Sequence, residues 1–416
     1  MKSKNNNLHN AKRQKNDEFY TTRAAVELEL SHYKEHFRGK VVYCNCDDPI
    51  ESEFTWYFAR KFEDWGLKRL ISTGYKESGH GVMYVYDGDK NGNRMPDRDE
   101  WIVTELQGNG DFRSEECVEL LKQADIVVSN PPFSLFRQYV AQLVEYDKEF
   151  LIIGNSNAIT YKEIFPLIKE NKLWLGVNPV KEFITPLTEV ENEKTQYKKD
   201  GKVYQKFGNI CWFTNLTHAK RNRPLDLVQK FDERYYNVYD NYPAVNIDKV
   251  MDIPCDEDIT LTLSKEVYPK WKNVYGEDCS IVEDNEDSVK VKIHNSIYGV
   301  PISFLDKYCP NQFRIVEFRK GADGKDLVYT ERDRERERER ECLTSEYSFN
   351  NCDSWNDKEF RGDDQRQTHL RKNIGSFKII GCTESEGRGL SNGLWFGGVP
   401  QPMVKGIGKF KRILIR

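Results

Sequence analysis

The sequence predicts an α/β protein whose first part contains a mostly parallel sheet. From about residue 40 to about residue 215, short apolar runs alternate with segments of helical period. The runs are compact, as are the buried strands of parallel sheets. After Thr214 the sequence becomes rich in Tyr, Asn and Asp, and the alternation stops. This change places a domain boundary near residue 218.

Five apolar runs mark the expected strands of this sheet. They occupy residues 41–44, 70–71, 101–103, 126–128 and 151–153. Apolar residues at helical spacing follow the first run over residues 54–62, and a helix-like segment follows the fourth at 135–140. Ligands of such sheets bind at the carboxyl ends of the strands, so functional residues are expected just after the runs.

Charge and low complexity divide the chain further. The 63 basic and 67 acidic residues give a net charge of -4, so only a local basic face could attract a polyanion. Residues 1–16 are expected to form a basic, disordered arm, with a merely solvated tail as the alternative. Residues 17–218 are expected to be a catalytic domain. Residues 219–416 form a second region, with a charged, low-complexity insertion at about 318–375.

Cysteine and histidine patterns indicate a protein without zinc. Ten cysteines contain no Cys-x-x-Cys pair, and the seven histidines form no convincing cluster with other ligand types. No run approaches the roughly 20 apolar residues that cross a bilayer, and the start lacks the apolar core of a signal peptide. The sequence therefore predicts a cytoplasmic protein that needs no metal and no membrane.

The strongest chemical signal is the sequence Asn130-Pro131-Pro132-Phe133, which directly follows the fourth expected strand. Methylation of a planar exocyclic amine needs acceptors that draw its N–H groups, and the Asn130 side chain and the Pro131 carbonyl are of that kind. The two prolines stiffen the turn, and the Phe133 ring offers a face on which a base can stack. The alternative is an ordinary loop opener after a strand.

With four further segments, this motif resembles the EcoRI-type adenine-specific DNA methylases. The segments are residues 17–21, 44–49, 208–213 and 298–301, and residues 411–416 also resemble the end of that family. The resemblance implies a Rossmann-like methyltransferase fold that binds S-adenosylmethionine, with a C-terminal target-recognition region. It also implies that Phe19, Tyr20 and Thr21 form a flap over the cofactor.

The expected cofactor loop after the first strand lacks glycine. It reads Cys46-Asp47-Asp48-Pro49, with Ser52 starting the next helix. Carboxylates suit the sulfonium and ammonium groups of S-adenosylmethionine, which favours Asp47 and Asp48 as ligands. The alternative is that Asp48-Pro49 only caps the helix.

A second cofactor contact is expected after residues 101–103. Asp111 and Phe112 would there place an acceptor and a ring near the cofactor adenine, although a Gly-rich turn is an equal alternative.

Candidate DNA-binding residues lie near the end of the first region and at the start of the second. Trp212 and Phe213 could stack on an extruded base or simply form a buried strand pair. Arg221 and Arg223 begin the second region and could contact phosphates of double-stranded DNA, which favours N6-adenine methylation at a specific sequence by base flipping. Alternatives are methylation of an RNA base or a protein glutamine, or an inactive DNA-binding regulator. A separate cognate restriction endonuclease is a possible partner.

Overall fold

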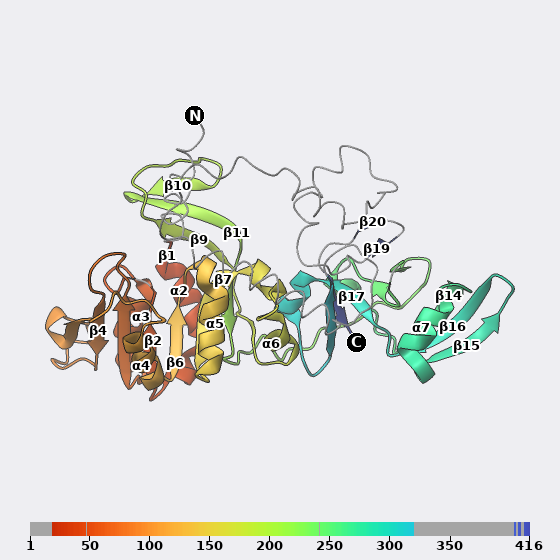
Figure 1. Cartoon of the computed structure of the whole chain (residues 1–416), viewed down its shortest axis with the longest axis horizontal. Helices are drawn as coiled ribbons and strands as arrows, with labels where there is room; N and C mark the ends of the chain where they lie inside the picture. The colour runs from red at the N-terminus through yellow and green to blue at the C-terminus, as the bar shows by residue number, and fades with distance from the viewer. Residues whose placement is uncertain (1–18, 47, 241, 320–402, 405–406, 409–411) are drawn as a thin grey trace, which may run out of the picture. The chain divides into compact units, whose positions relative to one another are not determined.

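The chain folds into two compact units. The computed structural model describes residues 19–46, 48–240, 242–319, 403–404, 407–408 and 412–416 (Figure 1). The first unit comprises residues up to Leu225 together with Ser303–Arg314, and the second comprises Asp226–Ile302 and the chain from Ile315 onward. Residues 1–16, Asp47 and nearly all of 318–375 lie outside the described residues, so the expectations placed on them remain predictions.

An 11-stranded mixed sheet forms the first unit (Figure 1). Its main path is β1-β9-β11-β7-β6-β2-β3-β4-β5, and β8 and β10 also pair with β11. The strands are β1 (Tyr20–Thr21), β2 (Val41–Cys44), β3 (Arg69–Gly74), β4 (Val82–Tyr86), β5 (Trp101–Glu105), β6 (Ile126–Ser129), β7 (Glu149–Asn155), β8 (Trp174–Leu175), β9 (Val180–Thr185), β10 (Gln196–Lys199) and β11 (Lys202–Thr214).

Only the centre of this sheet is parallel. Strands β3, β2, β6 and β7 pair in parallel, and strands at 41–44, 70–71, 126–128 and 151–153 were expected there from their apolar runs. Antiparallel strands flank this centre on both sides. The expectation of a mostly parallel sheet was therefore wrong, because apolar runs identify buried strands but carry no information on their direction.

The position of β5 also differs from the sequence prediction. Residues 101–103 were expected to be buried in the parallel sheet, but β5 pairs antiparallel with β4 at the edge. Ile102 and Val103 are 49% and 52% exposed, and only the Trp101 ring packs inward, against Tyr86 with 4.9 Å between centroids. A three-residue run is too short to separate an edge strand from a central one.

Five α-helices accompany the sheet within the described residues of the first unit. They are α2 (Arg23–Leu30), α3 (Glu53–Trp65), α4 (Glu115–Gln123), α5 (Phe136–Glu145) and α6 (Phe165–Lys169). Helix α3 begins after Ser52 and ends at Gly66, whose φ of +63° suits a residue without Cβ. Its aromatic face is buried, with Phe58 fully covered.

A buried carboxylate joins α2 to the segment that follows β8. Glu29 is fully buried, and its Oε1 accepts from the Tyr33 hydroxyl at 2.9 Å and from the Val177 N–H at 2.7 Å. Its Oε2 accepts from the N–H of Asn178 at 2.8 Å. A Cβ at Gly176 would lie 2.3 Å from Oε1, so glycine is required there. These bonds satisfy both carboxylate oxygens, and no basic side chain among the described residues pairs with Glu29.

The second unit contains a five-stranded sheet and a three-stranded sheet. The five-stranded sheet has the order β12-β13-β17-β21-β18, and the three-stranded sheet has the order β14-β16-β15. Strands β19 and β20 pair with each other in a separate two-stranded sheet. The strands are β12 (Asn237–Val238), β13 (Val245–Asn246), β14 (Asp258–Ser264), β15 (Cys279–Asp284), β16 (Ser288–His294), β17 (Tyr298–Pro301), β18 (Ile315–Arg319), β19 (Met403–Val404), β20 (Ile407–Gly408) and β21 (Arg412–Ile415). Strand β21 lies between β17 and β18, and Ile413 and Ile415 are fully buried.

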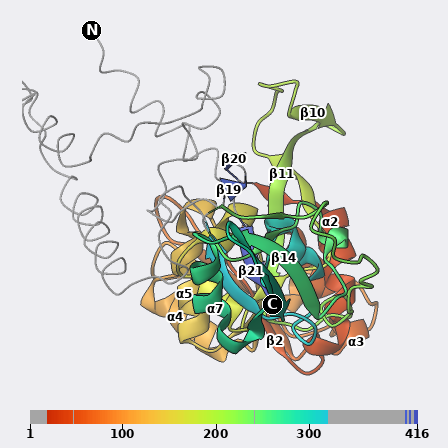
Figure 2. The same cartoon turned by 90° about the vertical axis from the view of Figure 1, so that its right-hand side faces the viewer.

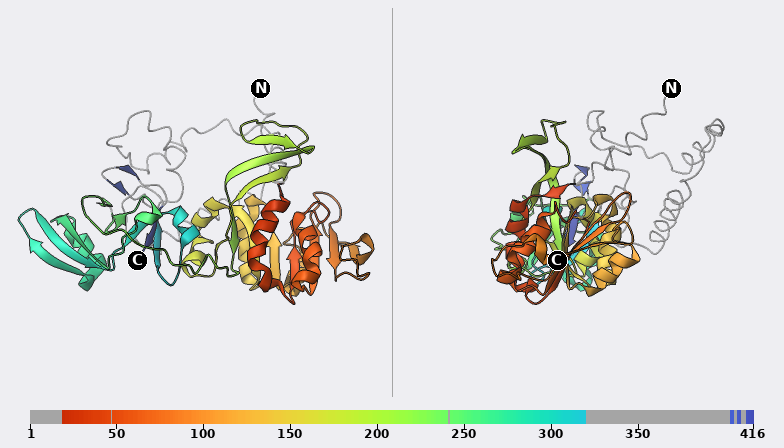
Figure 3. Two further views of the ribbon diagram at one scale, coloured as in Figure 1. Left: turned by 180° about the vertical axis from the view of Figure 1, so that it is seen from behind. Right: turned by 90° about the vertical axis from the view of Figure 1, so that its left-hand side faces the viewer.

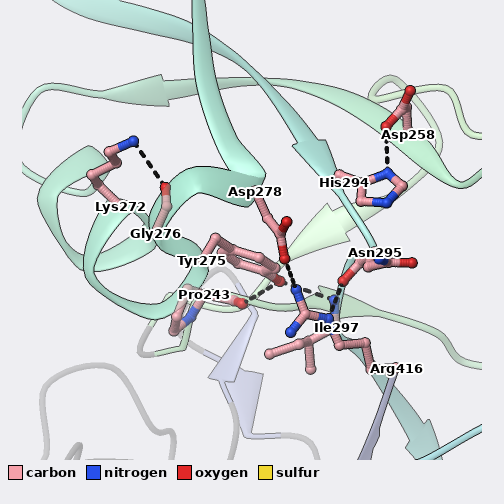
Figure 4. Close-up of polar contacts among 10 residues, drawn as sticks. All are labelled: Pro243, Asp258, Lys272, Tyr275, Gly276, Asp278, His294, Asn295, Ile297 and Arg416. Atoms are coloured by element: carbon pink, nitrogen blue, oxygen red, sulfur yellow. Dashed lines mark hydrogen bonds and ion pairs between the residues drawn. The ribbon is translucent and has the colours of Figure 1, made fainter.

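A polar cluster connects the two sheets of the second unit (Figure 4). Arg416, after β21, donates to the Asn295 carbonyl at 2.7 Å and pairs with Asp278. The Tyr275 hydroxyl, at the end of α7 (Tyr268–Tyr275), donates to the Pro243 carbonyl and accepts from the Ile297 N–H, both at 2.9 Å. The last strand is thereby fixed to the helix that covers the three-stranded sheet.

Candidate active site

The Asn-Pro-Pro-Phe sequence lies at the carboxyl end of β6, next to the end of β2. The Ser129 hydroxyl donates to the carbonyl of Asn45, and the Tyr139 hydroxyl of α5 donates to the Asn45 side-chain oxygen. Asn45 and Tyr139 are buried, so these bonds tie the two central strand ends together. Sequence reasoning had not assigned a role to Asn45 or Tyr139, because their contact spans 94 residues.

Asn130 is buried with one amide atom bonded and the other open. It is 8% exposed, and its Nδ2 donates to the Phe19 carbonyl at 2.5 Å. Its Oδ1 has no hydrogen-bond partner within the described part of the chain. An unpaired buried acceptor costs free energy unless a ligand satisfies it. The bond to Phe19 fixes the amide so that the acceptor atom is the open one.

Aromatic rings surround the residues that follow Asn130. Phe133 begins the 3₁₀ turn η3 (Phe133–Leu135) and lies edge-on to Phe183 of β9, with 6.5 Å between centroids. Phe183 also contacts Phe19 at 6.0 Å and Phe207 of β11 at 5.5 Å. Phe133 is half-buried, Pro131 is buried, and the Pro132 carbonyl accepts from the Leu135 N–H at 3.0 Å. Phe183 and Phe207 were not predicted, because ring clusters from distant strands leave no local pattern.

A short N-terminal strand, β1, also lies beside Asn130. Tyr20 and Thr21 form β1 and pair with Ile184 and Phe183 of β9. The Thr21 hydroxyl is buried and has no partner among the described residues. A cleft of about 290 Å³ lies beside this strand. It is lined by Tyr20, Thr21, Glu51, Glu53, Ile184, Thr185, Pro186, Leu187, Thr188, Gly201 and Lys202.

The loop after β2 turns sharply toward α3. Cys46 has a φ of +70°, and Asp48 Oδ1 accepts from the N–H groups of Ile50 at 2.8 Å and Glu51 at 3.4 Å. Ser52 is buried at the N-cap position of α3. Asp48 thus stabilises the turn before the helix, whereas Ser52 occupies the N-cap position. Cofactor binding by Asp48 stays a prediction, and Asp47 is not described.

Three glycines pack closely where the loop after β2 meets the end of β3. Pro49 is buried, and its Cδ lies 2.7 Å from the position a Cβ would take at Gly74. A Cβ at Gly81 would lie 2.7 Å from the Gly74 carbonyl oxygen, and one at Gly110, whose φ is +82°, would lie 2.3 Å from it. No side chain fits at these three glycines, which are 7 and 29 residues apart in the sequence.

Asp111 and Phe112 follow this glycine cluster but already have protein partners. Arg113 binds Asp111 with both ends of its guanidinium, at 2.9 and 2.6 Å, which lowers the pKa of the carboxyl group. Phe112 is buried edge-on against Tyr139, with 5.0 Å between centroids. Since β5 is an edge strand, the argument that placed these residues after a third parallel strand no longer holds.

Trp212 and Phe213 lie in the core of the sheet. They are 1% and 0% exposed, and their rings contact Phe54 at 5.9 Å and Phe136 at 5.0 Å. No ring face is left for an extruded base, because both lie on β11 where it pairs with β7. The buried strand pair, the alternative given above, describes them.

Arg221 is a structural residue rather than a surface cation. It is 6% exposed, stacks on the Trp174 ring at 3.7 Å and donates to the Asn171 side chain. Burial lowers the pKa of its guanidinium. Phosphate contact by Arg221 was therefore a wrong expectation, since a basic residue near a domain boundary can equally pack its stem and charge inward. Arg223 is exposed, and phosphate contact by this residue stays a prediction.

The described residues contain no group of three or more His, Cys, Asp or Glu side chains that could hold a metal ion. None of their helices is both long and apolar enough to span a membrane.

Comparison with known proteins defines the class of this site. A family model described as adenine-specific methyltransferase EcoRI matches residues 7–264 and 257–359. The chain is thus an adenine-specific methyltransferase. It belongs to the EcoRI methylase family.

Similar proteins support the same family. The type II methyltransferase M.EcoRI of Escherichia coli is 42% identical over 334 residues, covering 77% of this chain and 91% of that protein. Type II methyltransferase M.MgeORF184P of Mycoplasma genitalium is 34% identical over 317 residues, covering 74% and 85%. M.MpnI of Mycoplasma pneumoniae is 34% identical over 322 residues, with the same coverage. No solved structure matches the chain.

Proposed function

We propose that this enzyme transfers a methyl group from S-adenosylmethionine to N6 of adenine in double-stranded DNA at a specific sequence. The observation that carries the proposal is the open Oδ1 of Asn130, buried at the end of β6 and oriented by the Phe19 carbonyl. An amine N–H of the target is the partner that this acceptor lacks. Family membership supplies adenine as the base.

In this proposal, the residues of the turn after β6 bind the amine and the ring of the adenine. Asn130 Oδ1 accepts one N–H of the amine and the Pro131 carbonyl accepts the other, which draws the nitrogen lone pair toward the methyl group. The ring of Phe133 stacks on the base and excludes water. Contact with Phe183 fixes that ring before the base arrives.

The residues at the strand ends fit the cofactor in polarity and space. The open hydroxyl of Thr21 can bond its amino-acid end, and Asp48 adds a carboxylate at the end of β2. Phe19, Tyr20, Cys46, Pro49 and Ser52 complete this proposed set. Asp111 and Phe112 stay in it only as sequence predictions, because Arg113 and Tyr139 already contact them. When bound, S-adenosylmethionine supplies an electrophilic methyl group, so no metal is required.

The proposed catalytic domain and target-recognition region correspond to the two parts of the chain predicted from sequence. The central strand order of β3-β2-β6-β7 supports a Rossmann-like methyltransferase sheet within a catalytic domain of residues 17–218. Residues 219–416 are proposed as the target-recognition region, with Arg223 as an exposed phosphate contact. A cognate endonuclease acting separately, and cytoplasmic localisation, remain predictions.

Replacing Asn130 tests the proposal directly. Asn130→Ala removes the open acceptor, so kcat on duplex DNA should fall at least about a hundredfold while S-adenosylmethionine binding, measured by calorimetry, stays nearly unchanged. Asn222→Ala, at an exposed asparagine of the same unit, is the matched control and should retain activity.

Two results would contradict the proposal. If Asn130→Ala still methylates DNA, Asn130 is not the acceptor. If the wild-type enzyme methylates RNA or a protein glutamine but leaves adenine in duplex DNA unmodified, the substrate is wrong.

A further inference from the structure

Strand β11 extends far beyond the sheet on the side of the active site. Ile210 pairs with Asn155, the last residue of β7, so Lys202–Asn209 lie past the carboxyl end of the parallel strands. Eight extended residues span about 26 Å. Strands β10 and β9 pair with β11 on either side, and Figures 1, 2 and 3 show this three-stranded arm projecting from the first unit.

The tip of the arm is basic although the whole chain is acidic. Residues 196–206 contain four lysines and one acid, a net charge of +3, against -4 for the chain. Asp200 and Gly201 form the two-residue turn, with φ values of +51° and +76° that fit a tight hairpin. This turn sets Lys199 opposite Lys202.

One face of the arm gathers these charges with two aromatic rings. Because strand side chains alternate, Tyr197, Lys199, Lys202, Tyr204 and Lys206 point to the same side, here named the arm face. Glu182 of β9, opposite Lys206, lies on this face too and accepts from the Tyr197 hydroxyl at 2.9 Å, so the three lysines leave the face with a net charge of +2. The tyrosine rings stack with centroids 5.1 Å apart at 11°. Lys206 Nζ lies 5.1 Å from the Tyr197 centroid, and none of the three lysines makes an ion pair within the described residues.

The opposite face of the arm is already covered. Lys198 donates to the Thr188 carbonyl at 2.9 Å and pairs with Glu189 at 2.8 Å, both in the loop between β9 and β10. Val203 on that side is fully buried. The loop therefore leaves the arm face as the open side.

We propose that the arm face binds the sugar-phosphate backbone of the DNA substrate. Its lysines complement phosphate charge, and its stacked tyrosines hold Lys206 in place. The base of the arm contacts the active site, since Phe183 and Phe207 pack on Phe19, whose carbonyl orients Asn130. A duplex held by the arm face thus lies against the unit that contains the acceptor. The proposal rests on the proposed function for the identity of its partner.

The test is the salt dependence of DNA binding by the full-length enzyme. Lys199→Gln, Lys202→Gln and Lys206→Gln are combined, and binding to a labelled duplex is measured by fluorescence anisotropy between about 50 and 200 mM salt. The slope of log K against log salt is negative, and each lost phosphate contact reduces its magnitude by about 0.9. The magnitude should therefore fall by about 2 to 3 in the triple variant.

The matched control removes two lysines of the arm strands β9 and β10 whose side chains point to the other side of the arm. Lys181→Gln with Lys198→Gln should change the slope by less than about 0.5. An unchanged slope in the triple variant, or an equal fall in the control, would overturn the arm face as a DNA-binding surface. Asn130→Ala is measured alongside; loss of its methylation with a normal slope shows that the proposed function holds whatever the arm does.

Discussion

At the scale of single residues, a buried histidine makes stability depend on pH. His218 is 7% exposed, and its ring lies edge-on to Tyr33 with 5.8 Å between centroids. Its Nε2 donates to the Leu175 carbonyl at 3.0 Å, and Nδ1 has no partner within the described part of the chain. Burial lowers its pKa to about 4, and the nearby charges of Lys220 and Arg221 act in the same direction.

The sign of the pH effect follows from that shift. Between pH 6.5 and about 4 the unfolded chain takes up a proton that the folded chain refuses. The free energy of unfolding should therefore fall as pH drops through this window, by at most about 1.4 kcal/mol per pH unit. Urea unfolding of the wild type and of His218→Gln, which keeps a donor but cannot titrate, measures the difference. Identical pH dependence in the two proteins would show that His218 is not responsible.

Candidate site residues could be predicted from sequence where they form a local motif. They could not be predicted where their environment depends on residues far away in the sequence. The candidate residues Asn130, Pro131, Pro132 and Phe133 are adjacent in the sequence, so sequence alone could propose Asn130, whose Oδ1 is open among the described residues. The burial of Arg221 depends on Trp174 and Asn171, about 50 residues away. A basic residue gives no sign in the sequence of whether such partners exist.

At the scale of elements, the Glu29 carboxylate should contribute strongly to stability. Glu29→Ala leaves the N–H groups of Val177 and Asn178 and the Tyr33 hydroxyl without their acceptor. The Tyr33 hydroxyl is buried and the two N–H groups are partly buried. An unpaired buried donor costs about 1 to 3 kcal/mol, so the free energy of unfolding should fall by about 2 kcal/mol or more. Chemical denaturation measures this loss.

Two further variants separate the contribution of Glu29 from that of helix α2. Glu27→Ala, at an exposed glutamate of α2, should change stability by less than about 0.5 kcal/mol. Glu29→Gln retains one acceptor oxygen and should be intermediate. An equal, small effect of Glu29→Ala and Glu27→Ala would show that the bonds of Glu29 contribute little.

Strand positions could be predicted better than strand partners. The runs at 41–44, 126–128 and 151–153 became central strands because compact apolar segments require burial on both faces. The similar run at 101–103 became an edge strand, since β4, which was not predicted, covers the position beside β3. Likewise, β21 enters the middle of a sheet from the far end of the sequence.

At the scale of the whole molecule, the two units cut across the order of the sequence. Ser303–Arg314 returns to the first unit after the second has begun, and the Gln312 side chain accepts from the Leu225 N–H at 2.7 Å. A boundary read from composition marks where the character of the chain changes, but it carries no information on a later return. The proposed division into catalysis and target recognition is best tested on the intact chain.

The decisive whole-molecule prediction concerns how adenine reaches Asn130. A buried acceptor at the end of β6 is inaccessible to a base stacked in a duplex, so the target must leave the helix. Long-read sequencing of DNA from expressing cells first identifies the methylated sequence. Binding is then compared between that duplex and one with an abasic position opposite the target adenine.

Removing the opposing base lowers the cost of extrusion, which is a few kcal/mol, so affinity should rise about tenfold or more. An abasic position outside the recognised sequence is the control and should leave affinity unchanged. Phe133→Ala should weaken binding to the abasic duplex by about 1 to 3 kcal/mol, because the extruded base loses its stacking partner. Equal affinity for the paired and abasic duplexes would mean that the enzyme does not extrude the base on binding, and the role given to the Phe133 ring would fail with it.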